Sequence, residues 1–240
     1  MLVDGFDDPP VLMMPYNPPE YAGYVEGAGY ARLKDLYAWT YRLQSQSEAD
    51  HRYARLAARF RDRSGITVRS IDFRRFDEEM KTFHAIYCQA WKDNWGFVAP
   101  TQRAFTKMGK ELKLIADPRF VLCAEIGGQP VGCAVVVPDI NQALAGTNGR
   151  LLPLGLWRLL NRKRLVDRMR LLILGVLPEY RRMGLYPMII AEILQRAAGT
   201  RYQHIELSWV LEENDDINKP AADAGAVRYK TYRLYEKTWP

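Results

Sequence analysis

Hydrophobic and polar positions change their period several times along the chain. Residues 66–71 alternate with a period of two and are rich in β-branched side chains, which predicts a first strand beginning near Gly65. From Phe76 to Trp91 the apolar residues recur at helical spacing behind an acidic first turn, which predicts a helix. A second helix is predicted over about 101–115.

The next segment predicts a hairpin. Two apolar runs, 120–126 and 131–137, flank a Gly-Gly dipeptide that suits a tight turn between antiparallel strands. An irregular stretch follows through Arg150, and then a basic segment around 156–168. The apolar run 169–176 suits a buried strand.

The remaining pattern completes an alternation of helices and strands. It predicts a helix over 185–198, a strand over 204–210, a helix over 214–224 and a terminal strand over 227–237. Over residues 65–237 the predicted element order is therefore β-α-α-β-β-β-α-β-α-β, an α/β (α+β) arrangement.

The junction at 176–185 is the most informative part of the pattern. A buried strand ends at Pro178, which cannot donate to a sheet ladder, and a helix begins a few residues later. Such a turn presents backbone N–H groups at a helix N-terminus. With Arg181 and Arg182 alongside, it suits a phosphate or pyrophosphate. The alternative is a basic strand-loop-helix junction without a ligand.

The spacing Val176-x-Pro178-x-x-Arg181-x-x-Gly184 resembles the acyl-CoA signature of the GNAT superfamily, V-x-P-x-x-[RQ]-x-x-G-x-[GA]. The resemblance extends through the element order and implies a mixed central sheet flanked by helices. It also implies an N-acyltransferase whose acyl donor is acetyl-CoA or a longer acyl-CoA, with an acyl carrier protein as the alternative donor. Tyr186 stands where the signature ends in a small residue, which places a large side chain beside the phosphate arm.

The resemblance also implies a set of cofactor-binding residues. The backbone of the strand end would contact the thioester and pantetheine, and the turn would hold the pyrophosphate. These residues are Leu174, Val176, Leu177, Arg181, Arg182, Met183, Gly184, Leu185, Tyr186 and Asn214. For Asn214, which matches an asparagine that contacts the cofactor arm, a helix N-cap is an equal alternative.

Proton donors are where the chain departs from the family. The family's general acid is a tyrosine four residues before the glycine that closes the penultimate helix, and counting back from Gly225 gives Ala221. Tyr232 and Tyr235 on the following strand are the predicted substitutes. Because the family's tyrosine is absent at this position, a second interpretation stays open, namely a catalytically silent GNAT-like module that binds a ligand or partner.

The candidate general bases are glutamates of the penultimate strand and its end. Alternation places Glu206 and Glu212 on one strand face, where either would reach a shared cleft, and Glu213 follows. Exposed carboxylates are far commoner than catalytic ones.

Two loops are predicted to recognise the acceptor, a primary amine of a small molecule or peptide. One joins the first two helices and the other follows the hairpin. The predicted substrate-binding residues are Asn94, Trp95, Phe97, Asp139 and Asn141. Alternatively, the aromatic residues pack the helix join.

The N-terminal part lies outside this element order. Residues 28–39 parallel residues 224–235, with Ala, Gly, Arg and Lys recurring in register. This predicts that 1–43 is the closing helix and strand of a partial second GNAT-like unit, followed by a polar helical linker at 44–64 and the acyltransferase domain at 65–240. The chain would then be a fragment or a truncated gene. Coincidence in a short window is the alternative.

Composition narrows the cellular setting. The chain has 240 residues and 48% hydrophobic content, enough for a sizeable core, but no apolar run near the roughly 20 residues that span a bilayer. No secretory pattern opens it, so we expect a cytoplasmic protein without a transmembrane segment. The three cysteines and three histidines show no paired spacing, so neither a disulfide nor a metal site is expected.

Positive charge is concentrated in one segment. Residues 150–170 hold seven basic residues against Asp167 alone, within a net charge of +6. Coenzyme A phosphates, an acidic acyl carrier protein or an anionic membrane would fit such a segment, as would a solvated helix face. Nucleic acid is not expected, since no recognised motif accompanies the charge. The apolar run 151–160 suits a lid over a fatty acyl chain, a homodimer interface or a membrane-surface helix, and its shortness favours the first two.

Overall fold

A computed structural model describes residues 1–43 and 48–239, so residues 44–47 of the predicted linker and Pro240 lie outside the described residues. The chain divides into two compact units, each discontinuous in sequence. The first unit is Met1–Arg42, Asp139–Arg170 and Tyr202–Pro240; the second unit is Leu43–Pro138 and Leu171–Arg201. A unit boundary follows Arg42, next to the predicted end of the N-terminal segment, whereas the predicted boundary at 64/65 falls inside the second unit.

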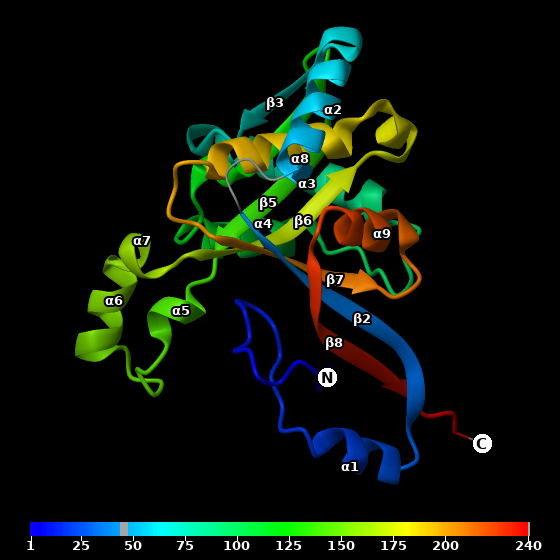
Figure 1. Cartoon of the computed structure of the whole chain (residues 1–240), viewed down its shortest axis with the longest axis vertical. Helices are drawn as coiled ribbons and strands as arrows, with labels where there is room; N and C mark the ends of the chain where they lie inside the picture. Colours follow the sequence, from blue (N-terminus) through cyan, green and yellow to red (C-terminus); the bar gives the residue numbers. More distant parts are fainter. Residues whose placement is uncertain (44–47, 240) are drawn as a thin grey trace. The chain divides into compact units, whose positions relative to one another are not determined.

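The predicted order of elements is confirmed (Figure 1). It consists of β3 (Ile66–Ser70), α3 (Phe76–Trp91), α4 (Gln102–Lys113), β4 (Val121–Ile126), β5 (Gln129–Pro138), β6 (Arg168–Val176), α8 (Leu185–Ala197), β7 (His204–Leu211), α9 (Asp215–Asp223) and β8 (Val227–Glu236). Before it come β1 (Leu2–Asp4), α1 (Tyr21–Gly27), β2 (Ala31–Arg42) and α2 (Glu48–Ser64). Three short helices, α5 (Asn141–Leu144), α6 (Leu156–Leu160) and α7 (Arg162–Leu165), occupy the segment predicted as irregular and basic.

The second unit is built on the predicted hairpin. Gly127 and Gly128 both have positive φ angles, +57° and +80°, which the tight turn between β4 and β5 requires. β3 pairs antiparallel with the outer side of β4. Helix α3 packs on β5 and buries Met80, Phe83 and Ile86, the apolar stripe that its sequence period predicts.

In the first unit, β2 lies between the two C-terminal strands, β7 and β8. β2 pairs antiparallel with β7 on one side and with β8 on the other, and β1 pairs with the far side of β8. The two similar sequences are thus neighbours in space. Each follows the end of a helix and consists of a glycine with positive φ (Gly29 at +83°, Gly225 at +86°) and a strand. The first-unit core includes a cluster of Leu2, Val11, Met14, Ala38 and Tyr232.

Candidate functional site

The predicted phosphate turn forms in the second unit. β6 ends at Val176, a 3₁₀ turn spans Pro178–Met183, and Gly184 leads into α8 with a φ of +82°, where a side chain would be strained. Gly184 occupies the N-cap position of α8, so the N-cap residue offers no side-chain acceptor to the first N–H groups of the helix. The first N–H groups of a helix have no acceptor within it, so this end of α8 suits an anion.

The end of α3 positions the turn. The Arg181 guanidinium donates a hydrogen bond to the carbonyl of Ala90 at 2.6 Å. The next residue, Trp91, packs over Gly175 so closely that a β-carbon at Gly175 would lie 2.3 Å from its ring. Arg181 therefore ties the turn to α3, and Gly175 allows α3 to approach the end of β6.

Helix α2 lies on the same turn. It packs along α8 (Figure 1), and a β-carbon at Gly184 would lie 2.4 Å from the ring of Phe60. Phe60 was not singled out in the sequence. The available signal was an apolar residue in a polar helix, three positions after the buried Ala57. Phe60 is thus a large side chain beside this glycine, and the crowding of the phosphate arm by Tyr186 stays a prediction.

A buried charged cluster forms in the first unit around Glu206. This residue has no exposed surface, and Nε of Arg170 lies 3.3 Å from its Oε2. Arg170 also donates from Nη2 to the Ser208 hydroxyl at 3.0 Å. Burial raises the pKa of Glu206 to about 7, and the charge of Arg170 opposes that rise. Glu206 and Ser208 share one face of β7, as alternation predicts.

The cluster contains unsatisfied polar atoms. Within the described part of the chain, neither carboxylate oxygen of Glu206 accepts a hydrogen bond, and Nε of Arg170 donates none. Buried polar groups are rarely left in this state, so a water molecule or a substrate group is expected at these atoms. In the sequence, Arg170 counted only as one of the basic residues of 150–170. An arginine inside the apolar run 169–176 was a usable signal for a buried charge.

The N-terminal segment covers this cluster. Arg170 donates from Nη1 to the carbonyl of Leu12. The sulfur of Met14 accepts from the hydroxyls of Ser208 at 3.9 Å and Tyr232 at 3.7 Å. The predicted general acid Tyr232 is therefore buried near Glu206, with its hydroxyl directed at Met14.

Two predicted acceptor residues hold the same segment. Asp139 is 2% exposed and accepts a hydrogen bond from the backbone N–H of Leu12 at 3.0 Å. Its burial raises its pKa. The amide of Asn141 donates to the carbonyl of Pro10 at 2.9 Å. Asp139 and Asn141 thus bind the chain itself in this structure.

The other predicted acid and base lie outside the Glu206 cluster. Glu212 follows the end of β7, so strand alternation does not carry it to Glu206 as expected. It forms an ion pair with Arg32 and accepts from the backbone N–H of Asp35 at 3.0 Å. The hydroxyl of Tyr235 donates to Glu26 at 3.1 Å on the surface.

The remaining predicted residues flank helices. Asn214 occupies the N-cap position of α9, but its side chain makes no capping hydrogen bond. In the loop between α3 and α4, Asn94 and Trp95 are exposed. The ring of Phe97 contacts the ring of Tyr87 edge to face, with 5.6 Å between the ring centroids, so Phe97 packs against α3 at the junction of α3 and α4.

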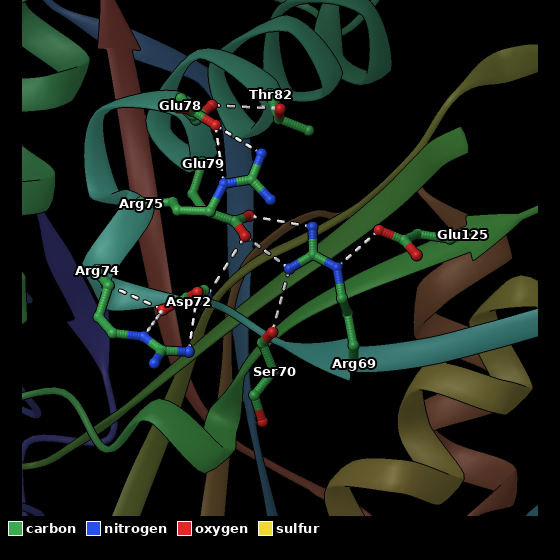
Figure 2. Close-up of polar contacts among 9 residues, drawn as sticks. All are labelled: Arg69, Ser70, Asp72, Arg74, Arg75, Glu78, Glu79, Thr82 and Glu125. Atoms are coloured by element: carbon green, nitrogen blue, oxygen red, sulfur yellow. Dashed lines mark hydrogen bonds and ion pairs between the residues drawn. The ribbon is translucent and has the colours of Figure 1, made fainter. Parts of the chain in front are cut away.

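A separate polar pocket in the second unit is lined by ion-paired side chains. Figure 2 shows Arg69 of β3 between the carboxylates of Glu125 and Glu79. Its Nε lies 2.7 Å from Glu125 Oε1, and its Nη1 lies 2.7 Å from Glu79 Oε1. Beside them, Arg75 pairs with Glu78 at 2.6 Å. These contacts join β3, β4 and α3, so we assign this network to the fold.

The chain is similar to known proteins of one family. The sequence profile of the Acetyltransferase (GNAT) family matches residues 80–221. "Protein YghO" of Escherichia coli K12 is 36% identical over 245 residues, and a "Bacterial ceramide synthase" of Caulobacter vibrioides is 36% identical over 248 residues. Both alignments cover 99% of this chain, and the chain spans 62% of the length of each relative.

Solved structures with low sequence identity share the fold. A GCN5-related N-acetyltransferase from Sphaerobacter thermophilus matches with a TM-score of 0.56 and 15% identity, covering 91% of this chain and 56% of that one. A tandem GNAT protein from the clavulanic acid biosynthesis pathway matches with a TM-score of 0.55 and 13% identity, covering 94% and 60%.

Proposed function

Because the chain belongs to the GNAT acetyltransferase family, we propose that it transfers an acyl group from coenzyme A to a primary amine. The donor class follows from the family. The acceptor class is supported by the ceramide synthase relative, because a ceramide is by definition an N-acylated long-chain amine. A lipid amine is therefore the first acceptor to test.

The observation that carries the proposal is the state of Glu206. An amine reaches an enzyme at neutral pH mainly as an ammonium ion, which must lose a proton before it attacks a thioester. A base with a pKa of about 7 both accepts that proton and is partly ionised at neutral pH. The two carboxylate oxygens, which accept no hydrogen bond from the described residues, are available for the ammonium group or a bridging water.

Coenzyme A supplies the activated acyl group as a thioester. The uncapped N-terminus of α8 would bind its diphosphate through backbone N–H groups, with Arg182 beside the turn. Asn214 would bind the pantetheine arm, since its side chain is not used for capping. As the amine nitrogen bonds to the acyl carbon and the carbon–sulfur bond breaks, Glu206 would accept one of the two protons that the ammonium nitrogen loses. The Tyr232 hydroxyl or water would pass the other proton to the departing thiolate.

Access to Glu206 requires the N-terminal segment to move. Leu12 and Met14 contact Arg170, Ser208 and Tyr232 directly. The acceptor amine would replace these contacts, so residues around Leu12 would open the acceptor site during turnover.

The test is a pH–rate profile of Glu206→Gln with palmitoyl-CoA and sphinganine. The wild-type kcat/KM should rise with a midpoint near pH 7, because ionised Glu206 is the active form. The variant should lose roughly 100-fold or more and also lose that midpoint, within the usual range for general-base catalysis. Glu212→Gln is the matched control, since this carboxylate lies in a surface ion pair. Unchanged rates in Glu206→Gln would exclude it as the base.

A catalytically silent binding module is the second candidate. It is supported by two contacts, the cover of Leu12 and Met14 over Glu206 and that of Phe60 over Gly184, together with Ala221 at the family's tyrosine position. This function predicts that acyl-CoA raises the melting temperature while no amine is acylated.

A further inference from the structure

We propose that the segment between β5 and β6 docks the protein on an anionic membrane surface. This segment holds the three short helices α5, α6 and α7, which pack against one another (Figure 1). Most of the large apolar residues in its central part, 151–160, are exposed. The leucine–tryptophan surface consists of Leu151, Leu152, Leu154, Leu156, Trp157 and Leu160.

Exposure at this surface is far above that of core residues. Leu152 is 69% exposed, Trp157 58% and Leu160 70%. No other ten-residue stretch of the described chain carries as many large exposed apolar side chains. Single exposed leucines are ordinary, but a contiguous apolar surface of this kind marks an interaction site.

Polar side chains hold the segment from within, which leaves the apolar ones outside. The amide of Gln142 donates to Asp167 at 2.7 Å and accepts from the backbone N–H groups of Asp167 and Arg168 at 3.1 Å. Arg158 donates to the carbonyl of Ala143 at 2.7 Å. These contacts fix α5 and α6 without using the leucines, so the exposed surface is not a loosely packed core.

Charge identifies the partner. Residues 141–166 contain five basic residues, Arg150, Arg158, Arg162, Lys163 and Arg164, and no acidic residue. Each Lys or Arg near an anionic leaflet contributes about 1 kcal/mol to binding, and tryptophan favours the membrane interface. A second copy of the chain fits less well, because a two-fold contact would place two such cationic surfaces against each other.

In the sequence, the short length of the apolar run 151–160 favoured a lid or an interface over a membrane-surface helix. In the structure, the apolar surface is assembled from an irregular turn and α6 together, and exposed cations follow in α7. Apolar contact and electrostatic attraction then act together, as in other peripheral membrane proteins.

Co-sedimentation with lipid vesicles tests the proposal without any turnover, so its failure would leave the proposed acyl transfer untouched. The 240-residue chain should bind vesicles of equal parts phosphatidylglycerol and phosphatidylcholine, and bind pure phosphatidylcholine much less. Lys163→Gln/Arg164→Gln should weaken binding about 30-fold, from about 1 kcal/mol for each charge. Leu152→Ser/Leu160→Ser should weaken it at least about tenfold, because two exposed leucines lose their apolar contact.

Matched controls lie in the second unit. Arg103→Gln/Lys107→Gln removes two exposed cations of α4, and Val98→Ser/Leu114→Ser removes two exposed apolar side chains. Both control pairs should bind vesicles like the wild type. The proposal is overturned if the wild type does not bind, if pure phosphatidylcholine binds equally, or if the controls weaken binding as much. It is also overturned if gel filtration shows a dimer that Leu152→Ser/Leu160→Ser dissociates.

Discussion

Replacing Glu206 by glutamine should change how the stability of the protein depends on pH. The side chain keeps its size and loses only its ability to ionise. Its surroundings are fully buried and include the charge of Arg170 at 3.3 Å. Burial raises its pKa from 4.5 to about 7, so the folded protein holds this proton over a pH range in which the unfolded chain releases it.

The sign and size follow from proton linkage. Between pH 4.5 and 7 the folded state binds more protons at this position than the unfolded state, so the free energy of unfolding falls as the pH rises. The contribution is complete below pH 4.5 and is lost as the pH passes through about 7. At about 1.4 kcal/mol for each pH unit, the loss over this window is about 3 kcal/mol.

Urea unfolding of both proteins between pH 4.5 and 8 measures this loss. The free energy of unfolding of Glu206→Gln, minus that of the wild type, should increase by about 3 kcal/mol across the window. Glu212→Gln, which removes the carboxylate paired with Arg32, controls for the loss of one negative charge. A flat difference for Glu206→Gln would show that the Glu206 carboxyl binds no more protons in the folded protein than in the unfolded chain over this range. The raised pKa on which the proposed base depends would then be wrong.

Three further experiments test other parts of the structure. Met14→Ala should lower the free energy of unfolding by about 2–4 kcal/mol in urea, because this 8% exposed side chain packs in the first-unit core; a loss below 1 kcal/mol would mean that the segment is not fixed there. Gly184→Ala should lower the free energy of unfolding by about 2 kcal/mol or more, because the glycine has a positive φ and the new β-carbon would clash with Phe60. In a double-mutant cycle, adding Phe60→Leu should recover only the part of this loss that comes from the clash. With a thiol reagent at pH 8, the half-buried Cys88 should react well before Cys123, whose pKa burial raises to about 12; equal rates would contradict the buried hairpin.

Most elements were predictable because their signals are local. The boundaries of α3 were obtained to the residue, since its apolar stripe and acidic first turn lie within sixteen positions. The hairpin followed from Gly127-Gly128 between two apolar runs. The short helices α5, α6 and α7 were missed because four- and five-residue helices leave no period to detect.

The Glu206 cluster could be predicted only in part. Glu206 was a candidate from its strand position, but its partner Arg170 lies 36 positions away on another strand, and such a pairing depends on how strands associate. The cover by Leu12 and Met14 involves an even longer separation. These contacts are set by tertiary packing, which a period along one strand does not encode. The same limit applies to Phe60, whose place on Gly184 depends on how α2 packs on α8.

The two segments of the internal sequence parallel pair with each other in the structure. In the repeat, Leu36 of β2 corresponds to Tyr232 of β8, and these two residues face each other in the antiparallel register. Around them, Ala31 pairs with Glu236 and Thr40 with Val227, so the start of each copy meets the end of the other. Two equivalent segments paired in this way are related locally by a two-fold axis, as in an isologous contact between identical subunits. Duplication itself stays a prediction, and this relation is what it would produce if one copy's closing strand paired with that of the other.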